Sequence, residues 1–257
     1  SWDRKRWAMR QSLRISSQYK QIKTKRKMPN AFTRQLPNAV TCCNLLCGCA
    51  ATGAAFYGHL HWAVIMIICG AVFDFFDGLT ARVLGVSSPI GKELDSLADC
   101  VTFGVAPSAI LFWVMHEVHC PEVLMPLKGI LPYTAFLMAA FSALRLAKFN
   151  LDTRQSTQFI GLPTPANALF WGSLVLGQHA FLTSLRFNIV WLIALTLLFC
   201  YLLVCEVPMM ALKFKELTWQ ALRWKVVFLV GCLCFIPLGY SAFAAIIVWY
   251  IFLSVVL

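Results

Sequence analysis

Four aspartates that could act together occur close in the sequence, at Asp74, Asp77, Asp95 and Asp99, in a chain with only eleven acidic residues. Asp74 and Asp77 are three positions apart, and Asp95 and Asp99 are four apart, so each pair projects from one face of a helix. The segment between the pairs is rich in glycine and serine and contains a proline, which favours a turn. The sequence therefore predicts two antiparallel helices whose four carboxylates face one another.

Carboxylates that converge in a medium of low dielectric constant repel one another, and a divalent cation with oxygen ligands relieves that repulsion. We expect Mg²⁺ or Mn²⁺ as the cofactor, with two ions as the working hypothesis. Two ions roughly 3.5 to 4 Å apart can hold substrate phosphates and stabilise both the attacking and the leaving oxygen of a displacement. The aspartates therefore indicate phosphoryl-type transfer.

Small and basic residues follow the first aspartate pair. Gly78 and Ala81 would allow a nucleotide or pyrophosphate to approach the helix backbone, and Arg82 could bind phosphate through two parallel hydrogen bonds. Each has an alternative role, because glycine in a membrane helix commonly serves packing and arginine commonly anchors the cytoplasmic end. Their combination with the aspartates favours the phosphate-binding interpretation.

The elements that carry these residues are expected to lie in a lipid bilayer. Hydrophobic residues make up 60% of the 257-residue chain and charged residues 13%, and the mean hydropathy is +0.72. A helix needs about 20 apolar residues to cross a bilayer. We predict an all-α integral membrane protein of about eight transmembrane helices, near residues 39–58, 61–84, 91–116, 129–149, 165–182, 187–207, 226–239 and 241–257, the last two being either two helices or one kinked helix.

The net charge of +11 is concentrated at the N-terminal end, where eleven of the 22 Lys and Arg residues precede Leu36. A basic segment beside a first spanning helix favours a location on the cytoplasmic side, facing anionic lipid. No aromatic platform for stacking bases accompanies these charges, so nucleic acid is not an expected partner.

The loops rich in Lys and Arg alternate along the chain, which places the active site and both termini on the cytoplasmic side of the cell membrane. We expect no cleaved signal peptide, since the first apolar stretch leads directly into further helices. The predicted organisation is a basic arm over residues 1–36, a six-helix catalytic core over 37–210, and a loop with a C-terminal helical hairpin over 211–257.

Written as a spacing pattern, the aspartate segment reads D-x2-D-G-x2-A-R-x8-G-x3-D-x3-D, and it resembles the signature of the CDP-alcohol phosphotransferase family. The resemblance implies a six-helix membrane core, often dimeric, with a site open to the cytoplasm, so a homodimer is expected. It also implies that the four aspartates bind metal, that Asp99 is the general base, and that the CDP site is shaped by Gly78, Ala81, Arg82 and Gly91.

Other segments resemble the phosphatidylserine synthase branch of that family: PNAVTCCNLLCG from Pro37, DSLADCVTFGVAPS from Asp95, LRLAKFN from Leu144 and FIGLPTPANA from Phe159. This branch implies CDP-diacylglycerol and L-serine as substrates. Groups that could bind the acceptor are Arg145, Lys148 and Asn150, although the branch typically has Arg where this chain has Lys148, and a positively charged helix end is the alternative. Thr41 and Asn44 are candidates to reach the nucleotide or to form hydrogen bonds between helices.

The expected reaction is attack of the serine hydroxyl on the lipid-side phosphorus, with Asp99 accepting the proton and CMP leaving. Sibling enzymes that use glycerol 3-phosphate, inositol phosphate or choline are the nearest alternatives. A cation-coupled transporter and an intramembrane prenyltransferase are more distant ones, because the chain shows neither an internal repeat nor a second aspartate-rich motif.

Overall fold

The computed structural model describes residues 31–86, 88–152, 159–209 and 219–256 of this chain. Most of the basic N-terminal arm, Arg154 and the lysines at positions 213 and 215 lie outside the described residues. The described residues form a helical bundle, with one antiparallel pair of two-residue strands, β1 (Phe159–Ile160) and β2 (Pro208–Met209). The predicted all-α fold class is confirmed.

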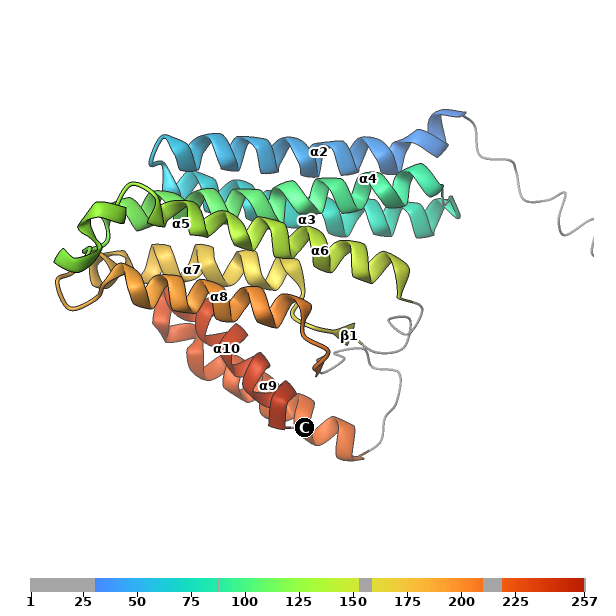
Figure 1. The fold of residues 1–257 in the computed structure, drawn as a ribbon. Helices are drawn as coiled ribbons and strands as arrows, with labels where there is room; N and C mark the ends of the chain where they lie inside the picture. Colours follow the sequence, from blue (N-terminus) through green and yellow to red (C-terminus); the bar gives the residue numbers. More distant parts are fainter. Residues whose placement is uncertain (1–30, 87, 153–158, 210–218, 257) are drawn as a thin grey trace, which may run out of the picture.

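The long helices run side by side, and a hairpin formed by the last two packs against one flank of the bundle (Figure 1). Three short 3₁₀ segments connect the helices, at Glu122–Leu127, Leu131–Phe136 and Ile236–Ser241. The α-helices are α2 (Ala31–Phe56), α3 (Leu60–Leu84), α4 (Pro89–Asp99), α5 (Ala106–Glu117), α6 (Leu137–Leu151), α7 (Thr164–Leu182), α8 (Ile189–Val204), α9 (Trp219–Phe235) and α10 (Ala242–Val256).

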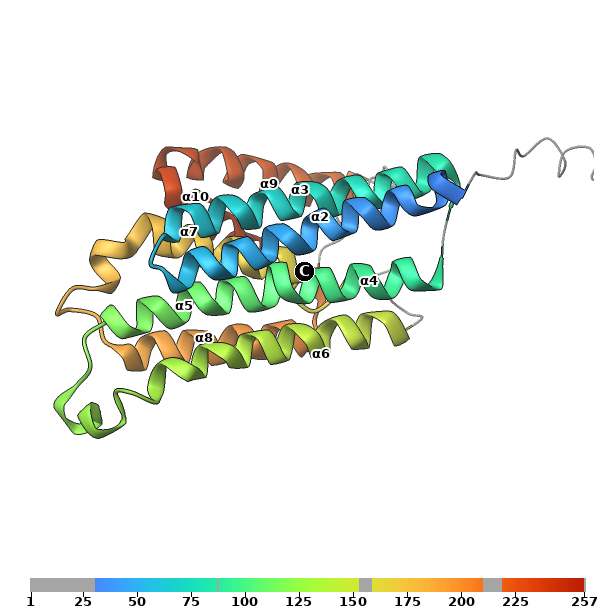
Figure 2. The ribbon, with the colours of Figure 1, turned by 90° about the horizontal axis from the view of Figure 1, so that it is seen from above.

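Helices α4 and α5 are one continuous rod, because a π-helical segment, Cys100–Val105, joins them without a break. The rod starts at a well-defined cap, where the Ser88 hydroxyl accepts a hydrogen bond from the Gly91 N–H at 2.9 Å and Pro89 occupies the first turn. Gly85 ends α3 in the left-handed conformation, with φ of +62°. The predicted turn between the two aspartate pairs is thereby confirmed, and α3 and α4 run in opposite directions (Figure 2).

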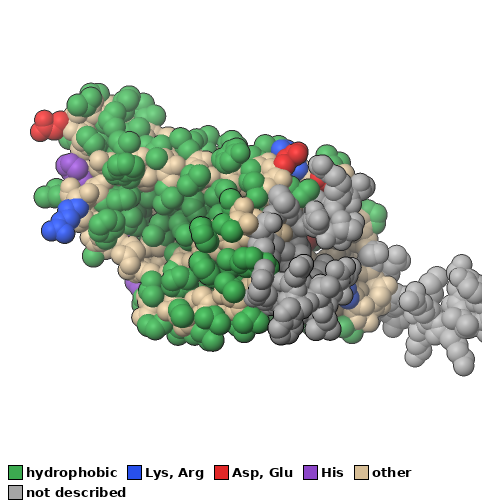
Figure 3. All heavy atoms as spheres, turned by 90° about the horizontal axis from the view of Figure 1, so that it is seen from below, with side chains coloured by type: hydrophobic (Ala, Val, Ile, Leu, Met, Phe, Trp, Pro, Cys, Tyr) green, Lys and Arg blue, Asp and Glu red, His purple; other side chains and the backbone are tan. Residues whose placement is uncertain are grey.

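By length and composition, four helical stretches could cross a membrane, at 35–56, 60–84, 89–117 and 226–256, and the last of these includes α9, α10 and the turn between them. On one face of the molecule, hydrophobic side chains cover the middle, whereas charged and histidine side chains lie toward the two ends (Figure 3). This distribution is the one expected of a chain surrounded by lipid over its middle and by water at its ends. The protein is a membrane protein.

Three predicted spans begin several residues away from the start of the observed helix. The first, expected at 39–58, begins at Ala31. The span expected at 129–149 begins as a regular α-helix only at Leu137, because Pro126 and Pro132 lack an N–H group and the chain before Leu137 adopts 3₁₀ turns. Helix α9 starts at Trp219, within the segment that was expected to be a loop.

The C-terminal apolar segment forms two helices rather than one kinked helix. Gly239, at φ of +61° and ψ of −126°, reverses the chain direction between α9 and α10, which then pack against each other. Residues other than glycine adopt this conformation at a cost, so the break follows from the local sequence.

Glycines allow the helices around the aspartates to approach closely. A Cβ atom added at Gly48 of α2 would lie 2.8 Å from the Thr102 Cα, and one added at Gly70 of α3 would lie 2.5 Å from the Thr102 Cγ2. Thr102, in the π-helical segment, is therefore wedged between α2 and α3. Small residues at such contacts are the usual means of close helix packing in membranes.

Candidate functional site

Three of the four aspartates come together at the centre of the site. Asp74 of α3 and Asp95 and Asp99 of α4 each offer a carboxylate oxygen, and these atoms all lie within 4.8 Å of one another. We call this group the carboxylate cluster. Helix α2 packs against both α3 and α4, so it holds the two aspartate-bearing helices on either side of the cluster. The predicted convergence of the two helices is confirmed for these three residues.

The fourth aspartate, Asp77, lies outside the carboxylate cluster and points toward α2. It is 6% exposed, and its Oδ2 accepts a hydrogen bond of 2.6 Å from the Thr41 hydroxyl. The three-residue spacing from Asp74 places Asp77 about 60° around the helix, which is enough to direct it to a different neighbour. Three of the four carboxylates therefore meet at one point, whereas Asp77 lies across a pocket from Asp95, and its predicted role as a metal ligand stays a prediction.

Helix α2 supplies a second polar contact, this time to the carboxylate cluster itself. The Asn44 side-chain N–H donates to Asp99 Oδ1 at 3.1 Å, and Asn44 is fully buried. The sequence allowed two roles for Thr41 and Asn44, contact with the nucleotide or hydrogen bonds between helices. The structure shows the hydrogen bonds. Both residues orient aspartates.

A π-helical turn begins directly after Asp99, and such turns frequently occur at functional sites. Within it, the Thr102 hydroxyl donates to the backbone carbonyl of Asn44 at 3.0 Å. This bond fixes the turn of α2 that carries Asn44 against the segment that follows Asp99. Sequence reasoning did not identify Thr102; the glycines at positions 48 and 70 that make room for it were the available signal.

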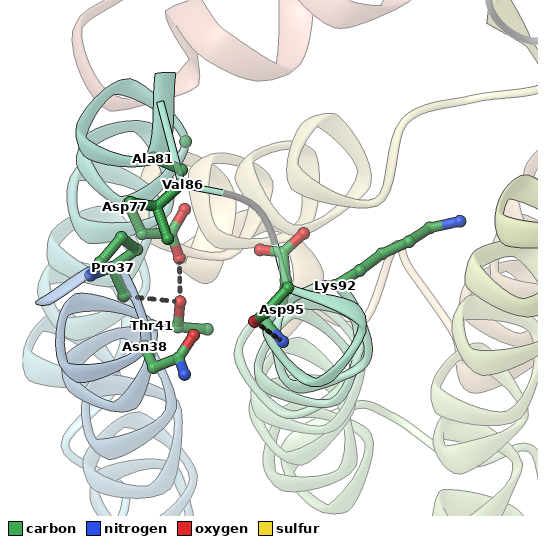
Figure 4. A pocket seen from close by; sticks show the side chains of 11 residues that line it. Pro37, Asn38, Thr41, Asp77, Ala81, Val86, Lys92 and Asp95 are labelled. Carbon is green, nitrogen blue, oxygen red and sulfur yellow. Dashed lines mark hydrogen bonds between the residues drawn. The ribbon is translucent and has the colours of Figure 1, made fainter. Parts of the chain in front are cut away.

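A pocket of about 260 Å³ opens beside the carboxylate cluster (Figure 4). Asp77 and Asp95 lie on opposite walls, from α3 and α4. The walls between them are formed mainly by small and polar residues, including four that the sequence assigned to the CDP site: Thr41, Gly78, Ala81 and Gly91. A Cβ atom added at Gly78 would meet no atom within 4 Å, so the backbone there faces open space.

Two basic residues, Arg82 and Lys92, lie near the pocket, and neither forms an ion pair with the aspartates. Arg82 is exposed in the last turn of α3 and does not line the pocket. Lys92 lies at the pocket wall but extends away from Asp77 (Figure 4), and its Nζ donates to the Asn150 carbonyl at 3.2 Å. Among the described residues, no Lys or Arg forms an ion pair with the four aspartates. Within the described part of the chain, the four aspartates therefore lack a direct ion-pair partner.

A second pocket, of about 320 Å³, contains two of the three residues predicted to bind the acceptor, Arg145 and Lys148 of α6. Arg145 is 8% exposed, and its Nη1 donates to the Thr164 hydroxyl at 3.4 Å, while its Nε has no hydrogen-bond partner. The guanidinium also interacts electrostatically with Asp99. A buried guanidinium with an unused donor can bind an anionic group.

Asn150, the third predicted acceptor residue, does not line this pocket. Its side-chain N–H donates to the Ser96 hydroxyl at 2.8 Å, and its carbonyl accepts from Lys92. Both bonds connect the end of α6 to α4, next to Asp95. The structure therefore places Asn150 where it positions α4.

The strand pair closes the second pocket on one side. Ile160 of β1 lines it, and Gly161, at φ of +73°, brings the chain against α8, where an added Cβ atom would lie 2.9 Å from the Leu203 carbonyl oxygen. Leu162 N–H then donates to the Leu202 carbonyl at 2.9 Å. Glycine is required for this close approach.

Comparison with known proteins agrees with the family resemblance seen in the sequence. A family model described as CDP-alcohol phosphatidyltransferase matches residues 34–230. Three similar proteins are each named CDP-diacylglycerol–serine O-phosphatidyltransferase. The Bacillus subtilis protein is 41% identical over 130 residues, 51% of this chain and 69% of that protein. The Mycobacterium leprae protein is 31% identical over 185 residues (68% and 57%), and the Saccharomyces cerevisiae protein is 37% identical over 129 residues (47% and 42%).

Proposed function

Because this chain belongs to the CDP-alcohol phosphatidyltransferase family, we propose that it transfers the phosphatidyl group of CDP-diacylglycerol to the hydroxyl of L-serine. The products are phosphatidylserine and CMP. The observation that carries the proposal is the carboxylate cluster beside a pocket with an open backbone surface, within a chain whose relatives are named for this reaction. The choice of serine rests on those relatives.

The carboxylate cluster fits a divalent cation. Its donors are hard oxygen atoms on two helices, and no cation of the described chain pairs with them. Asp74, Asp95 and Asp99 would hold Mg²⁺ or Mn²⁺, and Asp77, across the pocket from Asp95, would complete a site for a second ion. Bound metal would supply charge stabilisation to the phosphates of the CDP-lipid.

Asp99 is the proposed general base. Its carboxylate accepts the proton of the serine hydroxyl as the serine oxygen forms a bond to the lipid-side phosphorus and the bond from that phosphorus to CMP breaks. Asn44 holds Asp99 Oδ1 through its side-chain N–H, which leaves the second carboxylate oxygen for the proton.

The CDP moiety is proposed to occupy the 260 Å³ pocket. Gly78, Ala81 and Gly91 line it without large side chains, so a pyrophosphate can approach the backbone between Asp77 and Asp95. Arg82, exposed at the end of α3, is proposed to contact the nucleotide at the pocket entrance. Thr41 lines this pocket and is proposed to contact the nucleotide as well as to orient Asp77, and the fully buried Asn44 is proposed to orient Asp99.

The serine acceptor is proposed to enter through the pocket that contains Arg145 and Lys148. The unused Nε donor of buried Arg145 suits the serine carboxylate, and the electrostatic interaction of Arg145 with Asp99 links this pocket to the proposed base. Asn150 supports the arrangement by holding α6 against α4.

The proposed setting is the cell membrane, with the active site and both termini on the cytoplasmic side, and a homodimer as the assembly. The basic N-terminal residues support the orientation, since Lys and Arg accumulate on the cytoplasmic side of membrane proteins.

The test is CMP release by the purified protein in detergent, from CDP-diacylglycerol, with and without L-serine and with Mg²⁺, Mn²⁺ or a chelator. The expected result is release that requires both serine and metal. Release that requires glycerol 3-phosphate, inositol phosphate or choline instead would retain the family reaction and overturn the acceptor. No release by a folded sample under any of these conditions would overturn the enzyme assignment.

A further inference from the structure

A second hollow in the surface is apolar and lies on the other side of α3 from the CDP pocket. It has a volume of about 380 Å³, and its lining comes from α3 between Ile68 and Phe76, from Leu169 of α7 and from Phe243 of α10. We call it the apolar groove. The lining residues are all hydrophobic, so the groove is suited to a hydrocarbon ligand rather than to a polar one.

The groove begins next to the carboxylate cluster. Ala71, which lines it, is three positions before Asp74 and is therefore its neighbour on the helix surface. Phe75 and Phe76, which also line it, lie between Asp74 and Asp77 in the sequence. From Phe76 to Ile68 the groove follows α3 for about 12 Å, at 1.5 Å per residue.

Phe243 is held in the groove by hydrogen bonds between α7 and the hairpin. The Ser173 hydroxyl donates to the Tyr240 carbonyl at 2.5 Å and accepts from the Ala244 N–H at 2.8 Å. Gln178 donates to the Ser241 hydroxyl at 2.9 Å. These bonds flank Phe243 in the sequence, so they fix the start of α10 against α7.

Helix α10 lies beyond the residues that match the family model, which end at 230. The groove is therefore completed by a part of the chain outside the matched family region. The groove starts beside the carboxylate cluster, so a substrate whose phosphorus sits at the cluster can extend a fatty chain into it along the outside of α3.

We propose that the apolar groove binds a fatty acyl chain of the CDP-lipid substrate, and that Phe243 of the C-terminal hairpin sets how that chain fits. This inference rests on the proposed function only for the identity of the lipid. It assigns to α10 a role in selecting acyl chains, since the length and shape of the groove depend on where Phe243 lies.

The first test uses the full chain with two photoreactive lipids that carry the same diazirine in one acyl chain, CDP-diacylglycerol and phosphatidylcholine. We expect the CDP-lipid to label peptides that contain residues 68–76 and 243, and an excess of unlabelled CDP-diacylglycerol to suppress this labelling. Equal labelling by phosphatidylcholine would mean that bulk lipid fills the groove and would overturn the proposal. An unlabelled groove, including one covered by a second copy of the chain, would also overturn it.

The second test fills the groove. Val72 lines it and is 48% exposed, whereas Val248 of α10 does not line it and is 52% exposed, so Val72→Trp and Val248→Trp are matched changes. Val72→Trp should lower kcat/KM roughly tenfold for dioleoyl substrate and less than twofold for dioctanoyl substrate, because burial of about two methylene groups corresponds to roughly that factor. Val248→Trp should change neither value. An equal effect of Val72→Trp on both substrates, or none, would contradict the proposal.

The two tests separate this proposal from the proposed function. Photolabelling reports on binding and needs no turnover, so it decides the groove even if serine is not the acceptor. Phe243→Ala provides a second variant that removes atoms instead of adding them, at a residue that is 55% exposed. It should reduce the labelling of α10 by the CDP-lipid without loss of folded protein, and unchanged labelling would contradict the role of Phe243.

Discussion

Asn44 of α2 and Asp99 of α4 are joined by a hydrogen bond of 3.1 Å across 55 positions of sequence. The bond connects the proposed base to a helix that carries none of the four aspartates. Its donor is fully buried, and the other side-chain atom, Asn44 Oδ1, has no hydrogen-bond partner. The orientation of Asp99 therefore depends on how α2 is rotated about its axis.

Replacement of Asn44 with Leu should weaken metal binding at the carboxylate cluster. Loss of a residue that orients a metal ligand typically costs 10- to 100-fold in metal affinity or activity. We expect the Mg²⁺ concentration for half-maximal CMP release to rise by about that factor. Asn167→Leu is the control, since Asn167 is also fully buried but accepts its hydrogen bond from Trp171; it should leave the Mg²⁺ dependence unchanged.

Thr41→Val tests the contact to Asp77. The substitution keeps the side-chain shape but removes the 2.6 Å hydrogen bond, and a hydrogen bond to a charged group contributes about 1.5 to 3 kcal/mol. We expect kcat/KM for CDP-diacylglycerol to fall by tenfold or more. Thr196→Val is the matched control, because the buried Thr196 hydroxyl bonds only to the Leu192 carbonyl of its own helix. Equal losses in both variants would contradict a specific role of Thr41.

The aspartate spacing was sufficient to predict two facing helices, because positions three and four apart share a helix face whatever the rest of the fold does. The same reasoning could not separate Asp77 from the other three. Which carboxylate faces the centre depends on the neighbour it meets, and Asp77 meets Thr41 of α2. Such pairs across distant sequence positions are set by helix rotation, which periodicity alone leaves undetermined.

Periodicity also could not predict which residues line the acceptor pocket or how the C-terminal hairpin docks. Arg145 and Lys148 are three apart and share a pocket, but Asn150 faces α4 because it is two positions further along the helix. The sequence left open two helices or one kinked helix at the C-terminal end, and the backbone conformation of Gly239 decides for two. The contacts of Ser173 that dock the hairpin on α7 carried no signal in the sequence, because serine in a membrane helix can equally bond to its own backbone.

Two glycines of α3 should respond in opposite ways to alanine. Gly78→Ala should raise the free energy of unfolding by up to about 1 kcal/mol, because alanine favours the helix and the added Cβ meets no atom. It should nevertheless raise KM for CDP-diacylglycerol, since the methyl group enters the 260 Å³ pocket.

Gly70→Ala should instead destabilise the protein by about 1 to 3 kcal/mol, because its Cβ would lie 2.5 Å from Thr102 Cγ2 and 2.9 Å from Asn44 Oδ1. Thermal unfolding in detergent and CMP-release kinetics measure both effects. A Gly78→Ala variant with unchanged KM would argue against nucleotide binding at this pocket.

Asp99→Asn should separate substrate binding from transfer. The amide keeps the shape of the side chain but cannot accept the serine proton, so we expect CDP-diacylglycerol binding to remain measurable while CMP release falls by at least about a hundredfold. Glu122→Gln, at an exposed carboxylate that lines neither pocket, is the control and should leave CMP release unchanged. Near-native turnover by Asp99→Asn would refute its assignment as the base.

Metal removal should lower the thermal stability of the wild-type protein. The Asp74→Asn variant should be more stable than the wild type without metal and less stable with it. Without metal, the carboxylates within 4.8 Å repel one another, so neutralising one of them should stabilise the metal-free protein. With Mg²⁺ at about 100 times its dissociation constant, binding would add about 2.7 kcal/mol to the wild type and less to the variant. The unfolding temperatures of the two proteins should therefore cross: the variant is the more stable one in chelator, and the wild type in saturating Mg²⁺. Parallel curves with no crossing would mean that Asp74 is not a metal ligand, whatever the effect of the substitution on activity.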